Sequence, residues 1–434
     1  MRICYLTLGF PPAAGLGGAV TNACCLTTSL AAKGHQVTVC CTNLADKYTR
    51  LFAGTRRVEH RGVDVMYFHT HKIFPLGRDS FGLFVCQDFV TFCRDNLPQF
   101  DLVHVDGYRD FLTLVATHYC RRYGIPYVIQ PRGSIEPAFS SVAAKRLFDV
   151  SLGRVILRGS SLFIASSRRE RRQQENVIPP GQQVVCIANG IDTTPYRDLP
   201  ERGAFRQRHG ITASLLISYL GRVHPIKGID ILIRAFAAAE GRGRAVLAVI
   251  GPDEGYSWRL KALAEELGVS ESVVFSGEVQ GRQKLEAYVD SDVVVYASRS
   301  ESFGMVAFEA TLCGVPVISS RDSGCGELLA GLGIGFLTDY GDVSMLSHVI
   351  DYVVMHRHEI APRVARARDE IGRAFSWDQI ASAYERAYES VLKKRSASSS
   401  FQNAIAVRPI YEGTQSIVTA RGGKRHLLGP PPVE

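Results

Sequence analysis

The chain has 434 residues, of which 46% are hydrophobic and 21% are charged, and its formal net charge is +8. One ordinary hydrophobic core does not organise a chain of this length, so we expect two domains of a soluble globular protein. The modest positive charge comes without a basic stripe that interleaves aromatic residues, which argues against a nucleic-acid partner.

The 11 cysteines occur as adjacent pairs or singly within apolar runs. Because no Cys-x-x-Cys motif or zinc-like Cys/His spacing accompanies them, we interpret them as core residues in a reducing compartment. Gly9 and Pro11 interrupt the amino terminus too early for a signal peptide, and no run reaches the ~18 apolar residues of a membrane span. We therefore expect a cytoplasmic protein.

Apolar strands alternate with helices along the first part of the chain. Strands are predicted at Ile3–Phe10, Gln36–Thr42, Val63–Thr70, Asp101–Asp106, Pro126–Gln130, Ser161–Ser166 and Val184–Ala188. Helices are predicted at Ala19–Lys33, Phe81–Asn96, Asp110–Tyr123, Val142–Arg158 and from Ser167. This alternation is typical of a doubly wound parallel sheet, and we assign residues 1–195 to an amino-terminal Rossmann-like domain.

A glycine-rich turn follows the first strand. It carries Gly15, Gly17 and Gly18 in a G-x-G-G pattern, which does not fit the dinucleotide fingerprint G-x-G-x-x-G. Glycines let a backbone approach a ligand closely at a helix amino terminus, although a plain tight turn is a second interpretation. Asn43 stands where a nicotinamide site would need an acidic residue, so an oxidoreductase is disfavoured.

A second series of strands and helices begins after a polar link that ends near Arg208. Its strands are predicted at Leu215–Leu220, Ala245–Ile250, Val273–Gly277, Val293–Ala297, Val315–Ser319 and Gly335–Leu337. Its helices are predicted at Ile229–Ala239, Trp258–Leu267, Gln283–Asp290 and from Gly304, with a turn at Asp322–Glu327. We expect a second Rossmann-like domain, residues 209–374, and a ligand site in the cleft between the two domains.

The carboxyl-terminal stretch divides into a helix and a tail. Residues 375–395 place Ile380, Tyr384 and Tyr388 on one stripe of a helix. Residues 396–434 are Ser-rich at the head, Pro-rich at the end and weakly basic, so we predict a disordered tail. A weak peripheral contact of this tail with a membrane is the alternative interpretation.

Two cations and two carboxylates follow strand ends in the second series. Arg222 and Lys227 lie in G-R-V-H-P-I-K-G, Glu301 lies in the turn after Val293–Ala297, and Glu309 lies inside the apolar helix beyond that turn. Fixed cations suit a diphosphate, and carboxylates accept hydrogen bonds from sugar hydroxyls. A nucleotide-sugar ligand explains the cations and the carboxylates together. Taken separately, the two cations and Glu301 are also explained as solvated loop charges, and Glu309 as one member of a buried ion pair.

These motifs resemble the retaining glycosyltransferases of family 4 (glycosyl transferases group 1), which have the GT-B fold. The matching stretches are G-R-V-H-P-I-K-G, the glutamates of E-S-F-G-M-V-A-F-E, N-G-I-D at 189–192, F-S-G-E-V at 275–279 and F-S-W at 375–377. The resemblance extends from residue 1 to about residue 395. It implies an α/β protein with two Rossmann-like doubly wound domains facing a central cleft, and a helix at 375–395 that crosses back to the first domain.

The resemblance also implies a role for each matching residue in binding a nucleotide-diphosphate-sugar donor. Arg222 and Lys227 would hold the diphosphate, Glu301 the sugar hydroxyls and Glu309 the ribose hydroxyls. The backbone around Val279 would contact the base.

Further backbone contacts are implied on both sides of the cleft. The backbone at Ser302, Phe303 and Gly304 would contact the sugar and the phosphates. Gly17 and Gly18 would let the first loop close over the phosphates and the acceptor.

One position departs from the family pattern. The family often has Pro-His-Gly after the strand at 126–130, and this chain has Pro-Arg-Gly with Arg132. Arginine is not a plausible general base, so we assign Arg132 to substrate or phosphate binding beside the other catalytic candidates. For the nearby Glu136, His104 and Asp106, a solvated loop position or packing at the core or rim is the favoured interpretation.

The resulting hypothesis is a retaining transfer of a sugar to a hydroxylated acceptor: a glycan, a lipid-linked glycan or a small molecule. The acceptor hydroxyl would attack from the leaving-group side, and the departing phosphate oxygen would take its proton. We find no Asp-x-Asp metal motif in the sequence, and we expect no metal and no cofactor. The alternatives are a catalytically silent nucleotide-sugar-binding protein and a phosphorylase or epimerase of the same fold.

Overall fold

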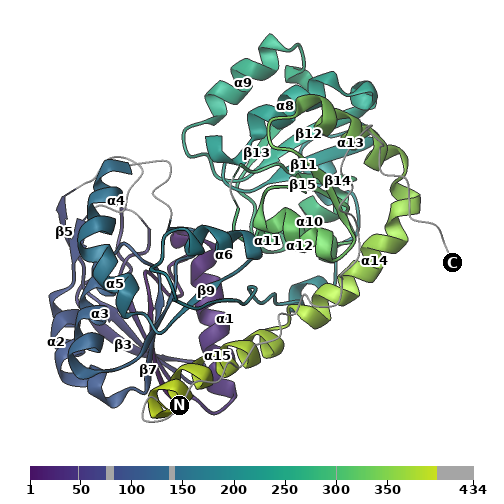
Figure 1. Ribbon diagram of the computed structural model, residues 1–434. Helices are drawn as coiled ribbons and strands as arrows, with labels where there is room; N and C mark the ends of the chain where they lie inside the picture. Colours follow the sequence, from purple (N-terminus) through teal and green to yellow (C-terminus); the bar gives the residue numbers. More distant parts are fainter. Residues whose placement is uncertain (47, 75–82, 136–141, 300, 398–434) are drawn as a thin grey trace.

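The computed structural model describes the whole chain except residues 47, 75–82, 136–141, 300 and 398–434. Two separate sheets organise the protein, one in the first half of the chain and one in the second (Figure 1). Their central strands are short and buried, as parallel strands covered by helices on both faces are expected to be.

Within the described residues, the first sheet has 8 strands, parallel throughout except for the antiparallel edge pair β3 and β4. In spatial order they are β10 (Val184–Cys186), β9 (Leu162–Ala165), β8 (Tyr127–Gln130), β7 (Leu102–Asp106), β1 (Arg2–Thr7), β2 (Gln36–Thr42), β4 (Val63–Phe68) and β3 (Arg56–His60). A separate hairpin is formed by β5 (His71–Phe74) and β6 (Leu83–Val85).

The second sheet has 6 parallel strands in that same described part of the chain. In spatial order they are β13 (Val273–Gly277), β12 (Ala245–Ile250), β11 (Leu215–Leu220), β14 (Val293–Tyr296), β15 (Val317–Ser320) and β16 (Gly335–Thr338). This is the strand order 3-2-1-4-5-6 of a Rossmann sheet, whose direction of winding reverses between β11 and β14.

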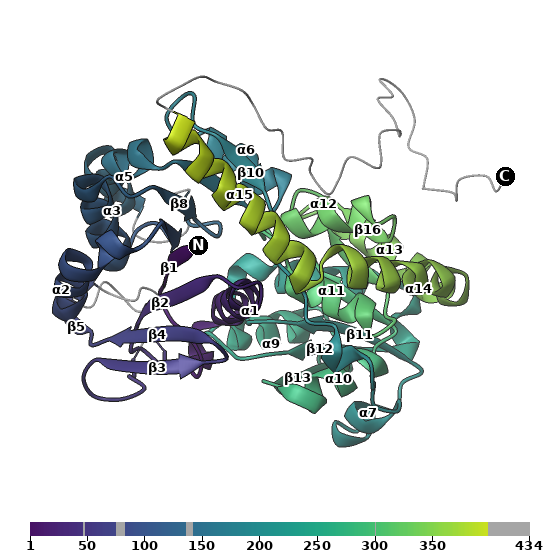
Figure 2. The ribbon, with the colours of Figure 1, turned by 90° about the horizontal axis from the view of Figure 1, so that it is seen from below.

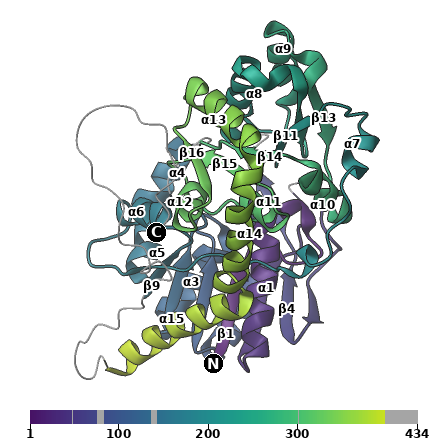
Figure 3. The same cartoon turned by 90° about the vertical axis from the view of Figure 1, so that its right-hand side faces the viewer.

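The connecting helices cover both sheets (Figures 1 and 3). In the first half they are α1 (Gly18–Ala32), α2 (Gln87–Asn96), α3 (Phe111–Tyr123), α4 (Val142–Phe148), α5 (Arg154–Gly159) and α6 (Arg168–Glu175). The short α7 (Ala204–Arg208) precedes the second half, whose helices are α8 (Ile229–Ala238), α9 (Ser257–Glu266), α10 (Gly281–Asp290), α11 (Met305–Leu312), α12 (Gly324–Gly331), α13 (Val343–Met355), α14 (Arg357–Ala374) and α15 (Trp377–Ala397).

The predicted fold class, with its two doubly wound sheets, is therefore confirmed. Both sheets lie within the predicted domain ranges, although the boundaries themselves, 1–195 and 209–374, stay predictions. The helix predicted at 375–395 is α15, which runs along the first half (Figure 2). The predicted tail lies outside the described residues, apart from residues 396 and 397 at the end of α15.

Three local predictions were incomplete. Strand β3 was missed because its residues are exposed or half-buried and show no apolar alternation. The turn predicted at Asp322–Glu327 was wrong, because Ser323 caps α12 by accepting a hydrogen bond from the Gly326 N–H at 2.9 Å. The helix predicted from Phe81 begins at Gln87, after β6.

The motifs N-G-I-D and F-S-W are in contact where the chain passes between the two halves. The Ile191 N–H donates to the Phe375 carbonyl at 2.7 Å, which joins N-G-I-D to F-S-W. A Cβ added at Gly190 would lie 2.3 Å from the Trp377 ring, so only glycine fits there. The connection between the halves is therefore packed against the start of α15.

Helix α15 is fixed to the first half by polar contacts. The Tyr384 hydroxyl donates to Gln130 Oε1 at 2.8 Å, and the Tyr388 hydroxyl lies 2.9 Å from His104 Nδ1. Burial, with Arg132 nearby, holds the pKa of His104 well below its usual range, so the imidazole is neutral. His104 is thus a packed core residue, which agrees with the favoured interpretation of the sequence.

We predict that Tyr388→Phe destabilises the protein by about 1–3 kcal/mol, because it leaves the buried Nδ1 of His104 without its partner. Urea denaturation measures this change in the free energy of unfolding. The matched control is Tyr352→Phe, whose side chain is exposed and whose loss should stay within about 0.5 kcal/mol. Equal small effects of both variants would show that the contact contributes nothing.

Candidate functional site

The candidate donor site lies at the point where the winding of the second sheet reverses. Ligands of open α/β sheets bind at the carboxyl ends of the strands at such a point. The loop Gly221–Gly228 leaves β11, and the turn Ser298–Gly304 leaves the adjacent strand β14. The structure therefore brings together the two segments that carry the predicted cations and Glu301.

Lys227, Tyr296 and Glu301 form a compact cluster at this point. The Lys227 ammonium donates to Glu301 Oε2 at 2.8 Å and to the Tyr296 hydroxyl at 3.0 Å. The Tyr296 hydroxyl in turn donates to Glu301 Oε2 at 2.7 Å. The side chains of Lys227 and Glu301 are mostly buried, so their charges lie close together in a region of low polarity.

Two opposing effects set the pKa of Glu301. Burial raises it, but the ammonium of Lys227 and the hydrogen bonds from Lys227, Tyr296 and the Phe303 N–H hold the pKa below its ordinary value. Glu301 is therefore ionised near neutral pH and accepts hydrogen bonds, as binding of sugar hydroxyls requires.

Arg222 lies on the same edge of the sheet but in a separate ion pair. Its Nη1 donates to both carboxylate oxygens of Glu254 at 2.8 Å, and its own carbonyl accepts from the Tyr219 hydroxyl. The Arg222 side chain is 55% exposed, whereas that of Lys227 is 11% exposed. The two predicted phosphate ligands thus differ: Lys227 is fixed and Arg222 is accessible.

Glu309 forms the third ion pair, inside the second half. It lies on α11, where the Lys284 ammonium donates to its Oε1 at 2.8 Å and the Tyr288 hydroxyl donates to its Oε2 at 2.7 Å. The sequence indicated that this buried carboxylate needs a partner, and the partners come from α10.

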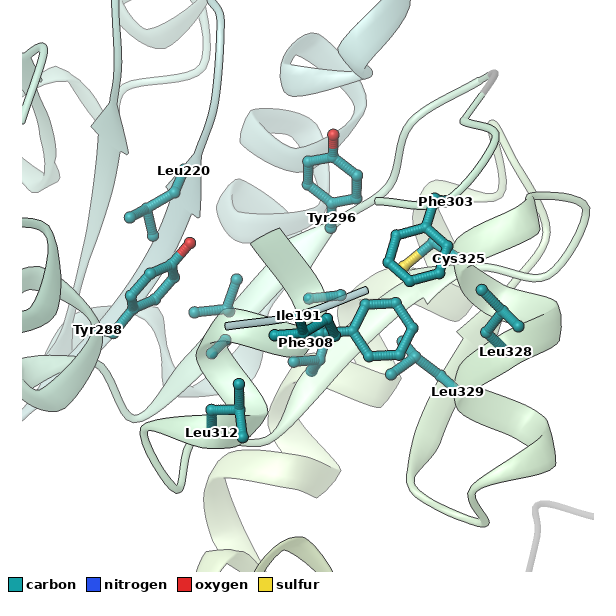
Figure 4. Close-up of a cluster of buried hydrophobic side chains, with 14 of the residues drawn as sticks. Ile191, Leu220, Tyr288, Tyr296, Phe303, Phe308, Leu312, Cys325, Leu328 and Leu329 are labelled. Carbon is teal, nitrogen blue, oxygen red and sulfur yellow. The ribbon is translucent and has the colours of Figure 1, made fainter. Parts of the chain in front are cut away.

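The turn before α11 presents backbone rather than side chains. Phe303 is buried against Phe308, with ring centroids 4.7 Å apart (Figure 4). Both rings also contact Phe375. Gly304 has a φ of 77° and a Cβ there would lie 2.7 Å from the Cβ of Cys325, so glycine is required. Among the residues that the structure describes, no side chain caps the amino terminus of α11, so its first N–H groups can face an anion.

Arg132 is committed to an ion pair within the first half. Its Nε donates to Asp106 Oδ1 at 2.6 Å, its Nη1 donates to Asn189 Oδ1 at 2.6 Å, and the Tyr5 hydroxyl donates to the same Asp106 carboxylate. Burial lowers the pKa of Arg132, but Asp106, Tyr5 and Tyr384 together outweigh burial and raise the pKa well above its usual range. Its predicted role in substrate binding stays a prediction, since these contacts account for the charge without a ligand.

The loop that carries Arg132 also reaches the second half. Arg132 adopts a φ of 53°, an uncommon conformation for a residue with a side chain, and Gly133 follows at 75°. A Cβ added at Gly133 would lie 2.5 Å from the Ser302 hydroxyl oxygen, so the two loops lie side by side. The first-half loop and the turn before α11 therefore face each other across the two halves.

A second contact joins the halves beside this loop. The carboxylate of Glu327, on α12, accepts from the N–H groups of Arg168 and Arg169 at 3.0 and 2.9 Å. These N–H groups begin α6, so a side chain of one half caps a helix of the other. Asp322 adds an ion pair with Arg169 at 3.2 Å.

The remaining predicted residues fall at the expected edges. Gly17, with a φ of 80°, begins α1, and a Cβ added at Gly17 or Gly18 would meet nothing within 4 Å. Val279 is half-buried just beyond the carboxyl end of β13. Glu136 lies outside the described residues.

The expectation that the sequence holds no Asp-x-Asp motif was wrong, because Asp290 and Asp292 have this spacing, but they lie at the opposite edge of the second sheet. Both residues precede β14, Asp290 accepts from the Arg206 N–H at 2.9 Å, and Asp292 pairs with Arg202 and Arg206 at 2.8 Å. These contacts fix the link before β11. Among the described residues, no group of three or more His, Cys, Asp or Glu could hold a metal ion.

Sequence reasoning missed the groups that hold the predicted residues. Lys284 and Tyr288 are four residues apart on α10, so this helical spacing could have indicated a polar pair facing Glu309. Tyr296 ends an otherwise aliphatic strand, which is a weaker signal. The pairing of Arg222 with Glu254 spans 32 residues and has no local signature.

Two family models match this chain. The model described as Glycosyltransferase Family 4 matches residues 16–195, and the model described as glycosyl transferases group 1 matches residues 201–368. The first match includes every strand of the first sheet except β1, and the second match includes every strand of the second sheet. Together they include every candidate residue from Gly17 to Glu309.

Similar proteins support the same grouping. The D-inositol 3-phosphate glycosyltransferase of Xylanimonas cellulosilytica is 31% identical over 256 residues, which span 56% of this chain and 60% of that relative. The sucrose-phosphate synthase structure from Thermosynechococcus elongatus has a TM-score of 0.71 at 19% identity, over 91% of this chain and 99% of the other. The structure of Anabaena HepE in complex with UDP-glucose has a TM-score of 0.68 at 21% identity, over 90% and 100%. The two structures establish the GT-B fold.

Replacing Arg132 tests whether its ion pair is structural. We predict that Arg132→Met lowers the free energy of unfolding by about 3–5 kcal/mol, because it leaves Asp106 buried without a counter-charge. Adding Asp106→Asn should recover part of this loss, which urea denaturation measures. In the exposed control pair, Arg222→Met should cost no more than about 1 kcal/mol. Equal losses for both single variants would contradict a structural role.

The lowered pKa of Glu301 predicts a pH dependence. Its contribution to stability is fully present above the unfolded pKa of about 4.3 and is lost as the pH falls through the lower folded pKa. We expect wild type to melt at a higher temperature than Glu301→Gln at neutral pH, and the difference to shrink as the solution is acidified. The exposed Glu278→Gln should show no such difference. A difference that is unchanged in acid would contradict the assignment.

Proposed function

Because this chain belongs to the group 1 glycosyltransferases, we propose that it transfers a sugar from a nucleoside-diphosphate-sugar to an acceptor hydroxyl with retention of configuration. The observation that carries this proposal is the Lys227–Tyr296–Glu301 cluster at the reversal point of the second sheet, beside the amino terminus of α11. The cluster combines a cation with an ionised acceptor at one point.

The diphosphate of the donor lies against Lys227, Arg222 and the first N–H groups of α11. Arg222 is available because an exposed ion pair such as that with Glu254 contributes about 0–1 kcal/mol, so a more highly charged diphosphate displaces the carboxylate. Glu301 accepts from the hydroxyls of the sugar, and Glu309, held by Lys284 and Tyr288, accepts from those of the ribose.

The reaction proceeds on one face of the sugar. The acceptor oxygen forms a bond to the anomeric carbon as the bond from that carbon to the phosphate oxygen breaks. The departing oxygen takes the proton of the acceptor hydroxyl, so no side chain serves as a base. The two cations and the helix amino terminus stabilise the negative charge that develops on the diphosphate.

Several finer assignments belong to this proposal. The likeness to HepE, which was solved with UDP-glucose, supports a nucleotide-sugar as the donor. We place the enzyme in the cytoplasm, in the synthesis of a polysaccharide, a lipid-linked glycan or a glycoconjugate. Arg222 and Lys227 take the part that a divalent cation plays elsewhere, so we expect activity without a metal.

The first test is thermal stabilisation by UDP-, GDP- and ADP-sugars. A donor at about 100 times its dissociation constant stabilises the folded state by about 2.7 kcal/mol, and we expect one nucleotide-sugar to do so in the presence of EDTA. Arg222→Ala and Glu309→Ala should abolish the shift, whereas Arg259→Ala, an exposed arginine on α9, should not. Proton NMR of the product then gives its anomeric configuration.

Three outcomes would contradict the proposal. Equal stabilisation of wild type and both site variants would place the donor elsewhere. Transfer with inversion would remove the one-face mechanism. Donor binding without transfer to any acceptor would favour the catalytically silent alternative.

A further inference from the structure

A ridge of exposed apolar side chains runs along the outer side of the first half. It comprises α4, a π-helical turn (Asp149–Gly153) and α5, here named the α4–α5 ridge. Leu147 and Val150 are 69% and 72% exposed, and Leu152 and Val155 are 47% and 46% exposed. These are four of the ten large hydrophobic residues that are exposed in the described part of the chain, within nine consecutive positions.

The exposure of these four residues does not result from poor packing of the ridge against the core. Ile156 and Leu157, on the inner side of the same ridge, are almost fully buried in the core of the first half. The ridge is therefore apolar on its inner and its outer side. A helix with an additional apolar face toward solvent commonly marks a surface that contacts another phase or molecule.

Positive charge surrounds the apolar residues. Arg146, Arg154 and Arg158 are exposed, and the described residues supply no ion pair to any of them. The one carboxylate of the ridge, Asp149, is already paired with Arg109 at 2.6 Å. The ridge thus presents apolar side chains and cations to solvent without compensating negative charge.

A groove of about 380 Å³ lies beside the ridge and shows the same combination. Its lining includes apolar residues, two arginines and the Arg109-paired carboxylate: Val150, Leu157, Val177, Ile178, Arg154, Arg158 and Asp149. An amphiphile that carries a phosphate next to a hydrocarbon chain matches this lining. Both the ridge and the groove therefore complement an anionic lipid.

We propose that the α4–α5 ridge docks on a bilayer surface that contains anionic lipid. Leu147, Val150 and Val155 enter the boundary between headgroups and acyl chains, and the arginines contact the phosphates, as in other interfacial helices. No helix in the described residues is long and apolar enough to cross a bilayer, so this contact is peripheral. It is distinct from a contact of the carboxyl-terminal tail.

The ridge is linked to the candidate site through Arg109. The Arg109 guanidinium donates to the Asp149 carboxylate and also to the carbonyl oxygens of Ser134 and Ile135. Those carbonyls belong to the loop of Arg132 and Gly133, which lies beside Ser302 of the second half. Figure 1 shows α4 at the end of the first half that is nearer the second.

This link indicates the class of acceptor. If the proposed transferase activity holds, docking through the ridge places the loop beside the bilayer, where the acceptor is a hydroxylated lipid-linked glycan. The docking itself rests on the ridge alone and does not depend on the transferase proposal.

Vesicle flotation of the full-length protein tests the docking. We expect binding to vesicles of equimolar phosphatidylglycerol and phosphatidylcholine, little binding to phosphatidylcholine alone, and weaker binding at about 1 M than at about 0.1 M salt. Leu147→Glu/Val150→Glu and Arg154→Glu/Arg158→Glu should each weaken binding about tenfold or more. Met355→Glu, on a side chain as exposed as Val150, and Arg366→Glu are the matched controls.

Each other outcome overturns the proposal. If wild type does not float, the protein does not dock on the bilayer. If the ridge variants float like wild type, another segment of the chain makes the contact. A dimer in sedimentation velocity that Leu147→Glu/Val150→Glu dissociates, without vesicle binding, would make the ridge a contact between two copies. Donor-induced thermal shifts of the same variants should equal those of wild type, so a failure of the transferase proposal remains distinguishable.

Discussion

A buried guanidinium requires a carboxylate beside it, and the pairing of Arg132 with Asp106 meets that requirement where three parts of the chain converge. Asp106 ends β7, Arg132 follows β8, and Asn189 begins the connection to the second half. This pair holds Arg132 in its uncommon backbone conformation and thereby positions Gly133 against Ser302. The relation of the two loops therefore depends on charges that lie inside the first half.

The second half shows a related arrangement of charges. Lys227, Arg222 and Lys284 each already face a carboxylate in the structure. The site is therefore almost neutral before an anion arrives, which limits the repulsion between its cations. A bound diphosphate changes this balance most at Arg222, because that ion pair is the most exposed of the three.

Local sequence patterns were enough to predict most of the fold and part of the site. The aliphatic run of β14 and the positions of Lys227 and Glu301 at neighbouring strand ends allowed their proximity to be predicted from parallel-sheet geometry. Strand β3 was missed because an edge strand in solvent needs no apolar pattern. The partners of Arg132 lie 26 and 57 residues away, and only the folded chain brings such distant residues together.

The cap that Glu327 places on α6 has a consequence for the movement of the two halves. Separation of the halves would hydrate the carboxylate and the freed N–H groups, so water would largely replace the broken contacts. The neighbouring contact of Arg169 with Asp322 is also between charged groups, which ions in solution screen. The contacts between the halves at this part of the boundary are therefore electrostatic, and the ionic strength of the surroundings sets how readily they break.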